Sequence, residues 1–205
     1  MQFTIRQMEV QGVNVVTSKA VDADFIKAEA PDVVILAAGG KRDTLGLGST
    51  AGTAVLTMDE MISAKIGQNV TIVGGNAQAV DTAMYLLAAG KNVQIVTPEG
   101  AELLGKGHSN WVKTFEIPAI TAKGVRIWQN ATVKAVGNGT VVIDGGYGVD
   151  QEVACDTVIE AMDMLPNTDI IDGLTGVETY AVCDCQHPYN IAEAINNANL
   201  VARYL

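Results

Sequence analysis

Six consecutive residues, GGNAQA from Gly74 to Ala79, have the spacing of a glycine turn that binds a diphosphate. In a G-x-G-x-x-G turn the first glycine makes the bend, the second admits the pyrophosphate, and the third lets helix and strand approach. Free amides and the dipole at the helix start stabilise the anion. Here Gly74 keeps the first position, Asn76 replaces the second glycine and Ala79 the third. The residues expected to bind a nucleotide at this turn are Gly74, Gly75, Asn76, Ala77 and Gln78.

Two positions depart from a full dinucleotide site. The side chain of Asn76 occupies space that a pyrophosphate would use, although asparagine tolerates unusual backbone angles better than most residues. At the end of the next strand, where an acid would hold the ribose hydroxyls, the sequence has Thr97. This change weakens the case for NAD. It is compatible with NADP, but neither Lys91 nor Arg126 is obviously placed to meet a 2′-phosphate.

The elements that must position this turn form the strongest unit in the sequence. A strand at 69–73, a helix to Ala89 stopped by Gly90, and a strand at 92–96 make a βαβ unit of about 28 residues. Apolar residues recur in the helix at spacings of three and four, which predicts one packing stripe. The stripe consists of Val80, Ala83, Met84, Leu87 and Ala88.

The remaining segments predict an α/β protein with an antiparallel meander. Asn138-Gly139 between alternating residues is the best hairpin signal in the chain. The expected helices lie at 2–11 (with Phe3, Ile5 and Met8 turned inward), at 58–65 (capped at Thr57) and at 109–124 (bent near Pro118). The expected strands lie at 12–16, from Pro31 to Gly40, and from Glu152 to about Asp163.

Composition limits the possible partners and location. The 205 residues include 13 basic and 23 acidic side chains, so the net charge of -10 opposes binding to nucleic acid or anionic lipid. No apolar run reaches the roughly 18 residues that span a bilayer, and the first residues lack a signal-peptide order. We expect a cytoplasmic protein. Cys155, Cys183 and Cys185 contain no CxxC pair and are expected to be reduced, core-filling thiols rather than metal ligands.

Four landmarks in a fixed order indicate a family. They are PDVVILAAGG from Pro31, VTIVGGNAQAVDTAMYLLAAGKNVQIVT from Val70, CDTVIEAMDMLPN from Cys155 and YAVCDCQHPYNIAEAINNANLVA from Tyr180. Together they cover most of the chain. The sequence resembles the C-terminal FAD/NAD(P)-binding region of the multidomain Old Yellow Enzyme-like reductases, the group with 2,4-dienoyl-CoA reductase, 2-enoate reductase and trimethylamine dehydrogenase.

This resemblance implies a Rossmann-like nucleotide-binding domain nested in a partial FAD-type domain, the two-dinucleotide-binding architecture of glutathione reductase. The NAD(P)-binding-type domain would be 46–164, and the partial FAD-type domain would be 1–45 with 165–205. By position, Asp184 matches the aspartate that holds the ribityl chain of the flavin. Ala38 and Gly39 would lie near the nucleotide half of the flavin, and the helix start after Pro188 would face its ring or pyrophosphate.

The resemblance also implies the chemistry and the partners. In such a parent enzyme, NAD(P)H passes a hydride to FAD, and electrons continue through an iron–sulfur cluster to FMN in a barrel domain. The FMN then reduces an activated C=C bond. The remaining domains of the parent, the FMN barrel and the iron–sulfur segment, would be the partners.

Several family glycines are replaced. Asp163 stands for the glycine before Pro166, and Cys183 stands for the glycine before Asp184. These changes add side chains, and at Asp163 a negative charge, where a flavin or nicotinamide would come close. The family's first glycine fingerprint does not occur in the sequence. We therefore expect either an excised piece of a larger reductase or a domain that has drifted from tight cofactor binding.

Each candidate residue also has a structural interpretation. Asp184 could cap a turn, His187 before a proline is expected to face solvent, and His108 is expected in a loop. Asp81 could interact with the helix dipole. No set of acid, base and nucleophile is present, so two functions stay open. One is an electron-input module of an NAD(P)H:flavin oxidoreductase, inactive alone; the other is a degenerate structural or adenine-nucleotide-binding module.

Overall fold

The computed structural model describes residues 2–145 and 148–205, and the chain divides into two compact units. One unit comprises Met1–Leu36 and Thr168–Ala181; the other comprises Ala37–Asn167 and Val182–Leu205. The larger unit contains the nucleotide turn and the segment around Asp184. The division into an NAD(P)-type domain and a partial FAD-type domain stays a prediction.

The smaller unit is built around two parallel strands. Its elements are α1 (Gln2–Val10), α2 (Ala23–Glu29), β1 (Val33–Leu36), η3 (Ile171–Gly173) and β12 (Glu178–Ala181). Strand β1 pairs in parallel with β12, so the strand predicted from Pro31 is confirmed over four of its residues. The first helix is also confirmed, but its predicted inward face is wrong because α1 buries no residue and Phe3 is 76% exposed. The strand expected at 12–16 is not formed; this segment is irregular and exposed.

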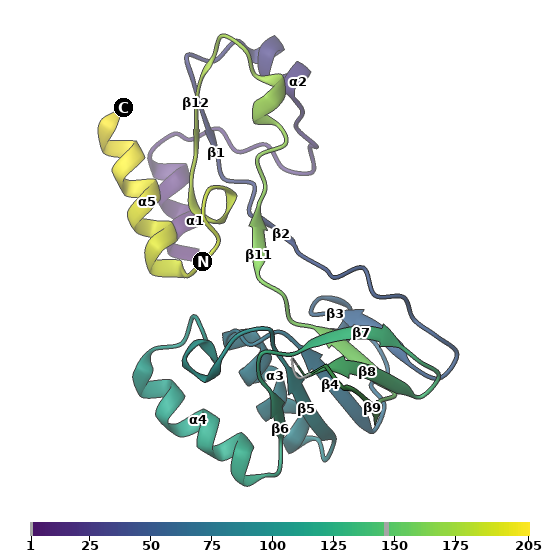
Figure 1. Ribbon diagram of the computed structural model, residues 1–205. Coiled ribbons are helices and arrows are strands. Elements are labelled where there is room, and N and C mark those ends of the chain that lie inside the picture. The colour runs from purple at the N-terminus through teal and green to yellow at the C-terminus, as the bar shows by residue number, and fades with distance from the viewer. Residues whose placement is uncertain (1, 146–147) are drawn as a thin grey trace. The chain divides into compact units, whose positions relative to one another are not determined.

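A five-stranded parallel sheet organises the larger unit, in the order β3-β10-β4-β5-β6 (Figure 1). Its strands are β3 (Ala54–Thr57), β4 (Asn69–Val73), β5 (Asn92–Val96), β6 (Arg126–Trp128) and β10 (Thr157–Glu160). Helix α3 (Ala77–Ala88) connects β4 to β5, which pair in parallel, so the predicted βαβ unit is confirmed. The central strands β4 and β10 are buried along almost their whole length, because both faces of the sheet are covered.

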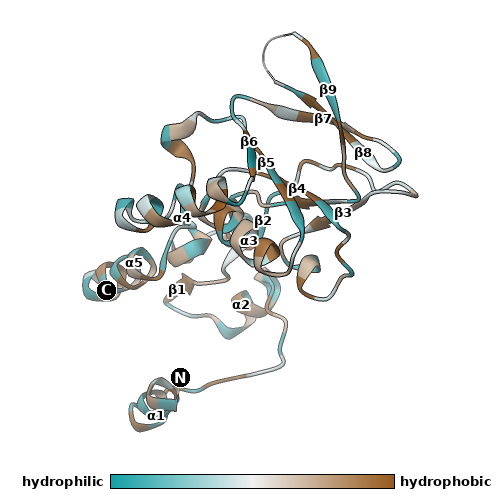
Figure 2. Ribbon diagram, turned by 90° about the horizontal axis from the view of Figure 1, so that it is seen from below, coloured by the Kyte–Doolittle hydropathy of each residue, from teal (hydrophilic) through white to brown (hydrophobic). Residues whose placement is uncertain are grey.

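Two apolar clusters cover the two faces of the sheet. Ile72 and Ile95 point toward α3 and α4 (Asn110–Ala122), whereas Val73 and Val96 point toward the antiparallel strands. Figure 2 shows hydrophobic residues on α3, whereas the sheet strands carry both hydrophobic and hydrophilic residues. The predicted helix stripe is only partly right. Helix α3 buries Ala79, Val80, Thr82, Ala83 and Leu86, while Met84 is 39% exposed, so the inward face is rotated from the expected one.

The antiparallel meander consists of β7 (Thr132–Val136), β8 (Thr140–Asp144) and β9 (Asp150–Ala154). The Asn138-Gly139 hairpin is confirmed between β7 and β8, with Gly139 at φ +88°. The single strand expected from Glu152 to about Asp163 is instead split into β9 and β10. The chain turns between them at Asp156, whose carboxylate accepts from the Asn69 amide at 3.0 Å and fixes the start of β10 beside β4.

Short elements complete the larger unit. They are β2 (Gly40–Arg42), η1 (Glu60–Ile62), η2 (Ala101–Leu103), β11 (Met164–Pro166), η4 (Cys183–Cys185) and α5 (Ile191–Tyr204). The helix expected at 58–65 is only the 3₁₀ turn η1. Its N-cap is Asp59, which makes no side-chain cap bond, so the expected cap at Thr57 is wrong, although Thr57 and Glu60 exchange hydrogen bonds. Helix α4 contains Pro118, as expected, but Trp111 and Phe115 lie exposed against each other.

Thus the predicted α/β class is confirmed as a mixed fold with a parallel sheet and antiparallel strands. The nesting of one dinucleotide-binding domain within another stays a prediction. Within the described part of the chain, no helix combines the length and the apolar character needed to cross a membrane. The cytoplasmic location stays an expectation.

One carboxyl group is buried at the end of the sheet. Glu160, the last residue of β10, is 2% exposed, and its Oε1 has no hydrogen-bond partner. Burial raises the pKa of this carboxyl, and the backbone amides of Leu47 and Leu45 only partly oppose the shift. Because the folded pKa lies above the unfolded one, folding is favoured most below the ordinary glutamate pKa, and stability falls as pH rises through the folded pKa.

We therefore expect the Glu160→Gln variant to be more stable than the wild type at pH 7, by about 1 kcal/mol, because it removes the charge but keeps the shape. The gain should shrink as pH falls toward 4. Urea unfolding at several pH values measures both. Equal stability differences at pH 4 and pH 7 would contradict this account.

Candidate nucleotide and flavin site

The glycines of the nucleotide turn are required by packing. Gly74 has φ +121°, and a Cβ added there would lie 2.3 Å from the Ala161 carbonyl oxygen. A Cβ added at Gly75 would lie 2.6 Å from Thr97 Oγ1. The bend therefore needs glycine because β4 passes close to the ends of β10 and β5. The two glycines fit a nucleotide turn, but their presence does not distinguish a bound ligand from close packing alone.

Asn76 begins helix α3 as its N-cap. Its Oδ1 accepts from the Ala79 amide at 3.0 Å, and its φ of -75° is ordinary. The residue therefore needs none of the unusual backbone angles that asparagine tolerates. Its Nδ2 donates to Asp163 Oδ1 at 2.9 Å, which ties the cap to the chain leaving β10. The asparagine thus satisfies the helix start with its own side chain.

The segment after η2 covers this helix start. The Gly105 amide donates to the Gly75 carbonyl at 2.6 Å, and the Ala77 amide donates to the Lys106 carbonyl at 2.7 Å. Lys106 Nζ reaches Asp163 Oδ2 at 3.2 Å. Since the first amide of α3 already has a partner, a diphosphate can reach it only if Lys106 moves away.

Asp163 and Lys106 stabilise each other's charged form. The hydrogen bond from Asn76, and then Lys106, lowers the pKa of the Asp163 carboxyl, against the opposing effect of burial. The same carboxylate raises the pKa of Lys106. Both groups are therefore charged at neutral pH. A negative charge consequently stands at the mouth of the turn.

The strand end next to the turn offers an acid that the sequence reasoning missed. Thr97 is fully buried, and its hydroxyl accepts from the Glu99 amide at 3.3 Å, so it is poorly placed to meet a ribose. Glu99 lies two residues further on, with Oε2 3.5 Å from the position of a Cβ on Gly75. An acid just past the end of β5 was the available signal. Glu99, Thr97, Gly74 and Gly75 line one small cavity of about 160 Å³.

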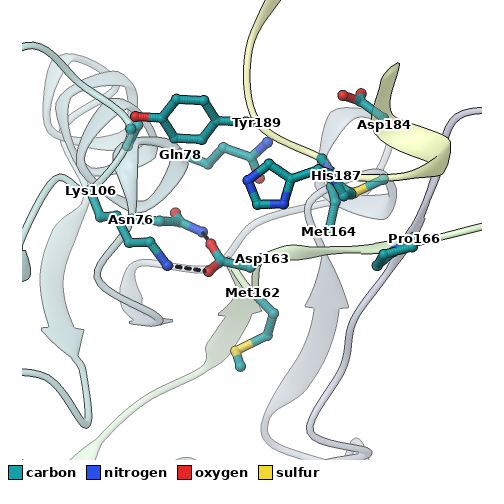
Figure 3. A pocket seen from close by; sticks show the side chains of 13 residues that line it. Asn76, Gln78, Lys106, Met162, Asp163, Met164, Pro166, Asp184, His187 and Tyr189 are labelled. Atoms are coloured by element: carbon teal, nitrogen blue, oxygen red, sulfur yellow. Dashed lines mark hydrogen bonds and ion pairs between the residues drawn. The ribbon is translucent and has the colours of Figure 1, made fainter. Parts of the chain in front are cut away.

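A larger cavity, of about 460 Å³, brings both halves of the expected site together. The helix start contributes Asn76, Ala77 and Gln78; the segment 162–166 contributes Asp163; and the segment 184–189 contributes Asp184. Figure 3 shows Asn76, Lys106 and Asp163 converging on one side, with His187 and Tyr189 nearby. Ala38 and Gly39 line neither cavity.

Helix α5 positions the segment around Asp184. Asn197 on α5 accepts from the Cys183 amide at 2.9 Å and donates to Gln186 Oε1 at 2.8 Å. Asp184 is half-buried in η4 and makes no hydrogen bond or ion pair among the described residues. This leaves its carboxylate available to a ligand. His187 is exposed, as expected, and the Ala38 carbonyl accepts from Asn167 at 3.2 Å.

The thiols behave partly as expected. Cys155 and Cys185 are buried, free core residues, whereas Cys183 is only half-buried. Burial raises the pKa of the Cys155 thiol. Cys183 has φ +59°, a left-handed conformation that favours glycine. A cysteine in this conformation is strained.

The residues present fit a dinucleotide only in part. The bend of Gly74 and Gly75, the acid Glu99 and the available carboxylate of Asp184 fit such a ligand. The diphosphate position at the start of α3 does not fit such a ligand in this conformation. The Lys106 carbonyl already accepts from the Ala77 amide, and Asp163 places a negative charge beside it. A diphosphate would therefore have to displace the covering segment.

A parallel sheet with a tight glycine turn between a strand and the helix that follows is the architecture typical of dinucleotide-binding domains. Residues 3–191 match the family described as pyridine nucleotide-disulphide oxidoreductase. The chain belongs to this family, and membership implies binding of FAD and a nicotinamide nucleotide.

Relatives and structures agree with this assignment. A probable N-methylproline demethylase of Rhizobium meliloti (strain 1021) is 38% identical over 101 residues, covering 47% of this chain and 15% of the relative. Bilirubin reductase of Mediterraneibacter gnavus (strain CC55_001C) is 25% identical, covering 100% of this chain and 32% of the relative. Histamine dehydrogenase from Rhizobium sp. 4-9 shares the fold, with a TM-score of 0.78 at 19% identity, covering 99% and 35% of the two chains. The matched region thus spans only 15% and 32% of the two curated relatives, the demethylase and bilirubin reductase.

The packing role of Gly74 can be tested without any ligand, by measuring the free energy of unfolding. We expect Gly74→Ala to destabilise the ligand-free protein by at least about 3 kcal/mol, because it adds a backbone clash to a strained φ. Gly90→Ala is the matched control, since Gly90 has φ +75° but open space around an added Cβ, and should cost about 1 kcal/mol. Denaturant unfolding gives both values. Similar losses for the two variants would contradict the packing role.

The strain at Cys183 is measurable in the same way. Cys183→Gly should be more stable than Cys183→Ala by about 1 kcal/mol, because alanine loses the thiol but keeps the left-handed backbone. The comparison controls for removal of the Sγ contact to the Ala194 carbonyl, which both variants lose. An alanine variant as stable as the glycine variant would show that the backbone carries no strain.

Proposed function

We propose that the chain is the pyridine-nucleotide- and flavin-binding module of an NAD(P)H:flavin oxidoreductase of the enoate or dienoyl-CoA reductase type. The observation that carries this proposal is the cavity of about 460 Å³, because Ala77 of the nucleotide turn and Asp184 of the flavin-type segment line the same space. A hydride acceptor must lie next to its donor, so one shared cavity is the arrangement that such a transfer needs. When bound, the nicotinamide and the flavin supply the redox chemistry.

The residues of this chain would bind and orient. Glu99 would accept from the ribose hydroxyls, and the start of α3 would face the diphosphate once Lys106 has moved away. Asp184 would accept a hydrogen bond from the flavin chain, as the resemblance implies. His187 and Tyr189, stacked with ring centroids 6.3 Å apart, would shield the cavity from water.

The parent protein would be larger than this chain. The limited share of the relatives that the chain covers is consistent with further domains, and we propose that these include an FMN barrel and an iron–sulfur segment. The chain would then be their C-terminal region. A parent of this kind would pass electrons received here to a C=C bond elsewhere.

A second function is favoured by a separate observation. The Ala77 amide is bonded to the Lys106 carbonyl, and Asp163 is paired with Lys106 Nζ beside it, so the turn is closed and a carboxylate lies next to the diphosphate position. This arrangement favours a degenerate module that keeps the fold for packing or binds an adenine nucleotide weakly.

Removing the charge of Asp163 separates the two functions. We expect Asp163→Asn to bind ADP and NADH roughly tenfold more tightly than the wild type, because Lys106 is released and a like charge is removed from the diphosphate site. Asp172→Asn, in η3 of the smaller unit, changes the net charge equally but leaves the Lys106–Asp163 ion pair intact, and should bind like the wild type. Calorimetric titration with ADP, NADH, NADPH and FAD measures the affinities.

Thermal unfolding gives a second reading of the same affinities. A ligand present at 100 times its Kd should stabilise the protein by about 2.7 kcal/mol. If neither the wild type nor Asp163→Asn binds any of the four ligands, the degenerate module is the better description. Tighter binding in both aspartate variants would mean that net charge, not the closed turn, controls affinity.

A further inference from the structure

Three side chains able to ligate a metal converge outside the two cavities. They are Asp81 from α3, His108 from the loop before α4, and Glu116 from α4, and one ligand atom of each lies within 4.8 Å of the others. His108 Nε2 lies 3.2 Å from Asp81 Oδ1 and 3.2 Å from Glu116 Oε2. The proposed function uses none of the three, so the cluster requires its own explanation.

The hydrogen bonds of the cluster leave one buried oxygen unsatisfied. His108 Nε2 can carry only one proton, and its hydrogen-bond geometry is met with Asp81. Glu116 Oε2 lies at ion-pair distance from the same nitrogen, but it is buried and makes no hydrogen bond. A buried acceptor without a donor is unfavourable and rare in folded proteins. The single proton on His108 Nε2 therefore leaves Glu116 Oε2 without a hydrogen-bond donor.

The charges of the cluster also favour a bound cation. Two carboxylates face a single imidazole, which carries at most one positive charge. Among the described residues, no lysine or arginine forms an ion pair with Asp81 or Glu116. A divalent cation would balance both carboxylates and leave the imidazole neutral, the form in which histidine binds metals.

The distances fit a metal site. In a tetrahedral site with bonds of about 2.0–2.1 Å, neighbouring ligand atoms lie roughly 3.3–3.4 Å apart. The two measured separations of 3.2 Å are close to this value. Imidazole with carboxylates is a ligand set for zinc and its neighbours rather than for calcium or magnesium.

We propose that Asp81, His108 and Glu116 bind a divalent transition-metal ion, Zn²⁺ above all, with three protein ligands and water completing the coordination. The site does not depend on the proposed nucleotide function. It would join α3 to α4 and to the loop that begins at Gly105, whose carbonyl accepts from the His108 amide at 3.0 Å. The ion would thereby hold the segment that covers the nucleotide turn.

Zinc binding to the chelator-treated, tag-free protein tests the site. Calorimetry should show one Zn²⁺ per chain, and Asp81→Asn, His108→Gln and Glu116→Gln should each weaken its affinity at least about tenfold. These substitutions keep shape and remove ligand character. His187→Gln is the matched control, because His187 is the other histidine of the chain and should leave zinc affinity unchanged. No saturable binding, or equal binding by all variants, would overturn the proposal.

Two further measurements keep the result unambiguous. Cys183 is a half-buried free thiol, so zinc binding lost in Cys183→Ser but kept in His108→Gln would place the ion elsewhere and overturn the site. If a variant of Asp81, His108 or Glu116 fails to fold, nuclear magnetic resonance of the wild type with Mn²⁺ tests the metal site instead. Selective broadening of the His108 ring signals supports the proposal, and broadening of His187 alone, or of neither ring, refutes it.

Discussion

Three chain segments lie close together at the start of helix α3, and this packing determines how the strands and helices of the larger unit are arranged. The bend at Gly74 and Gly75 lies against the ends of β10 and β5, with room for no Cβ at either glycine. Because the bend is this tight, β4 can run directly into α3, and α3 can return the chain to β5 beside β4. The two apolar clusters on the faces of the sheet depend on this crossover.

The same crowding has a consequence for binding. Amides at a helix start attract anions, and here the Lys106 carbonyl and the Asn76 side chain supply their partners from within the protein. Asp163 then joins the cap and the lysine from the chain leaving β10. The nucleotide turn is therefore intact as a fold element and closed as an anion site. A ligand must compete with these internal contacts, which sets its affinity.

The covering segment also connects the two proposals. Residues 105–108 bond to the turn through Gly105 and Lys106 and reach Asp81 and Glu116 through His108. An ion held by the three side chains would stabilise the closed arrangement, whereas a diphosphate would oppose it. Their opposite preferences for one segment would couple the two sites, since each ligand favours a different position of the same residues.

Local patterns determined the βαβ unit, the Asn138-Gly139 hairpin and the strand at Val33–Leu36, because their signals lie in consecutive residues. They failed at 12–16, where apolar residues lack a partner strand, and at Asp156, where a side chain turns one expected strand into two. Sequence also identified Asn76, Asp163 and Cys183 as departures. Only the tertiary structure decided that Lys106 closes the turn and that Glu99 lines the cavity beside it. It also decided that Asp81, His108 and Glu116 meet. These contacts join residues far apart in the chain, and their distances depend on packing that no local pattern encodes.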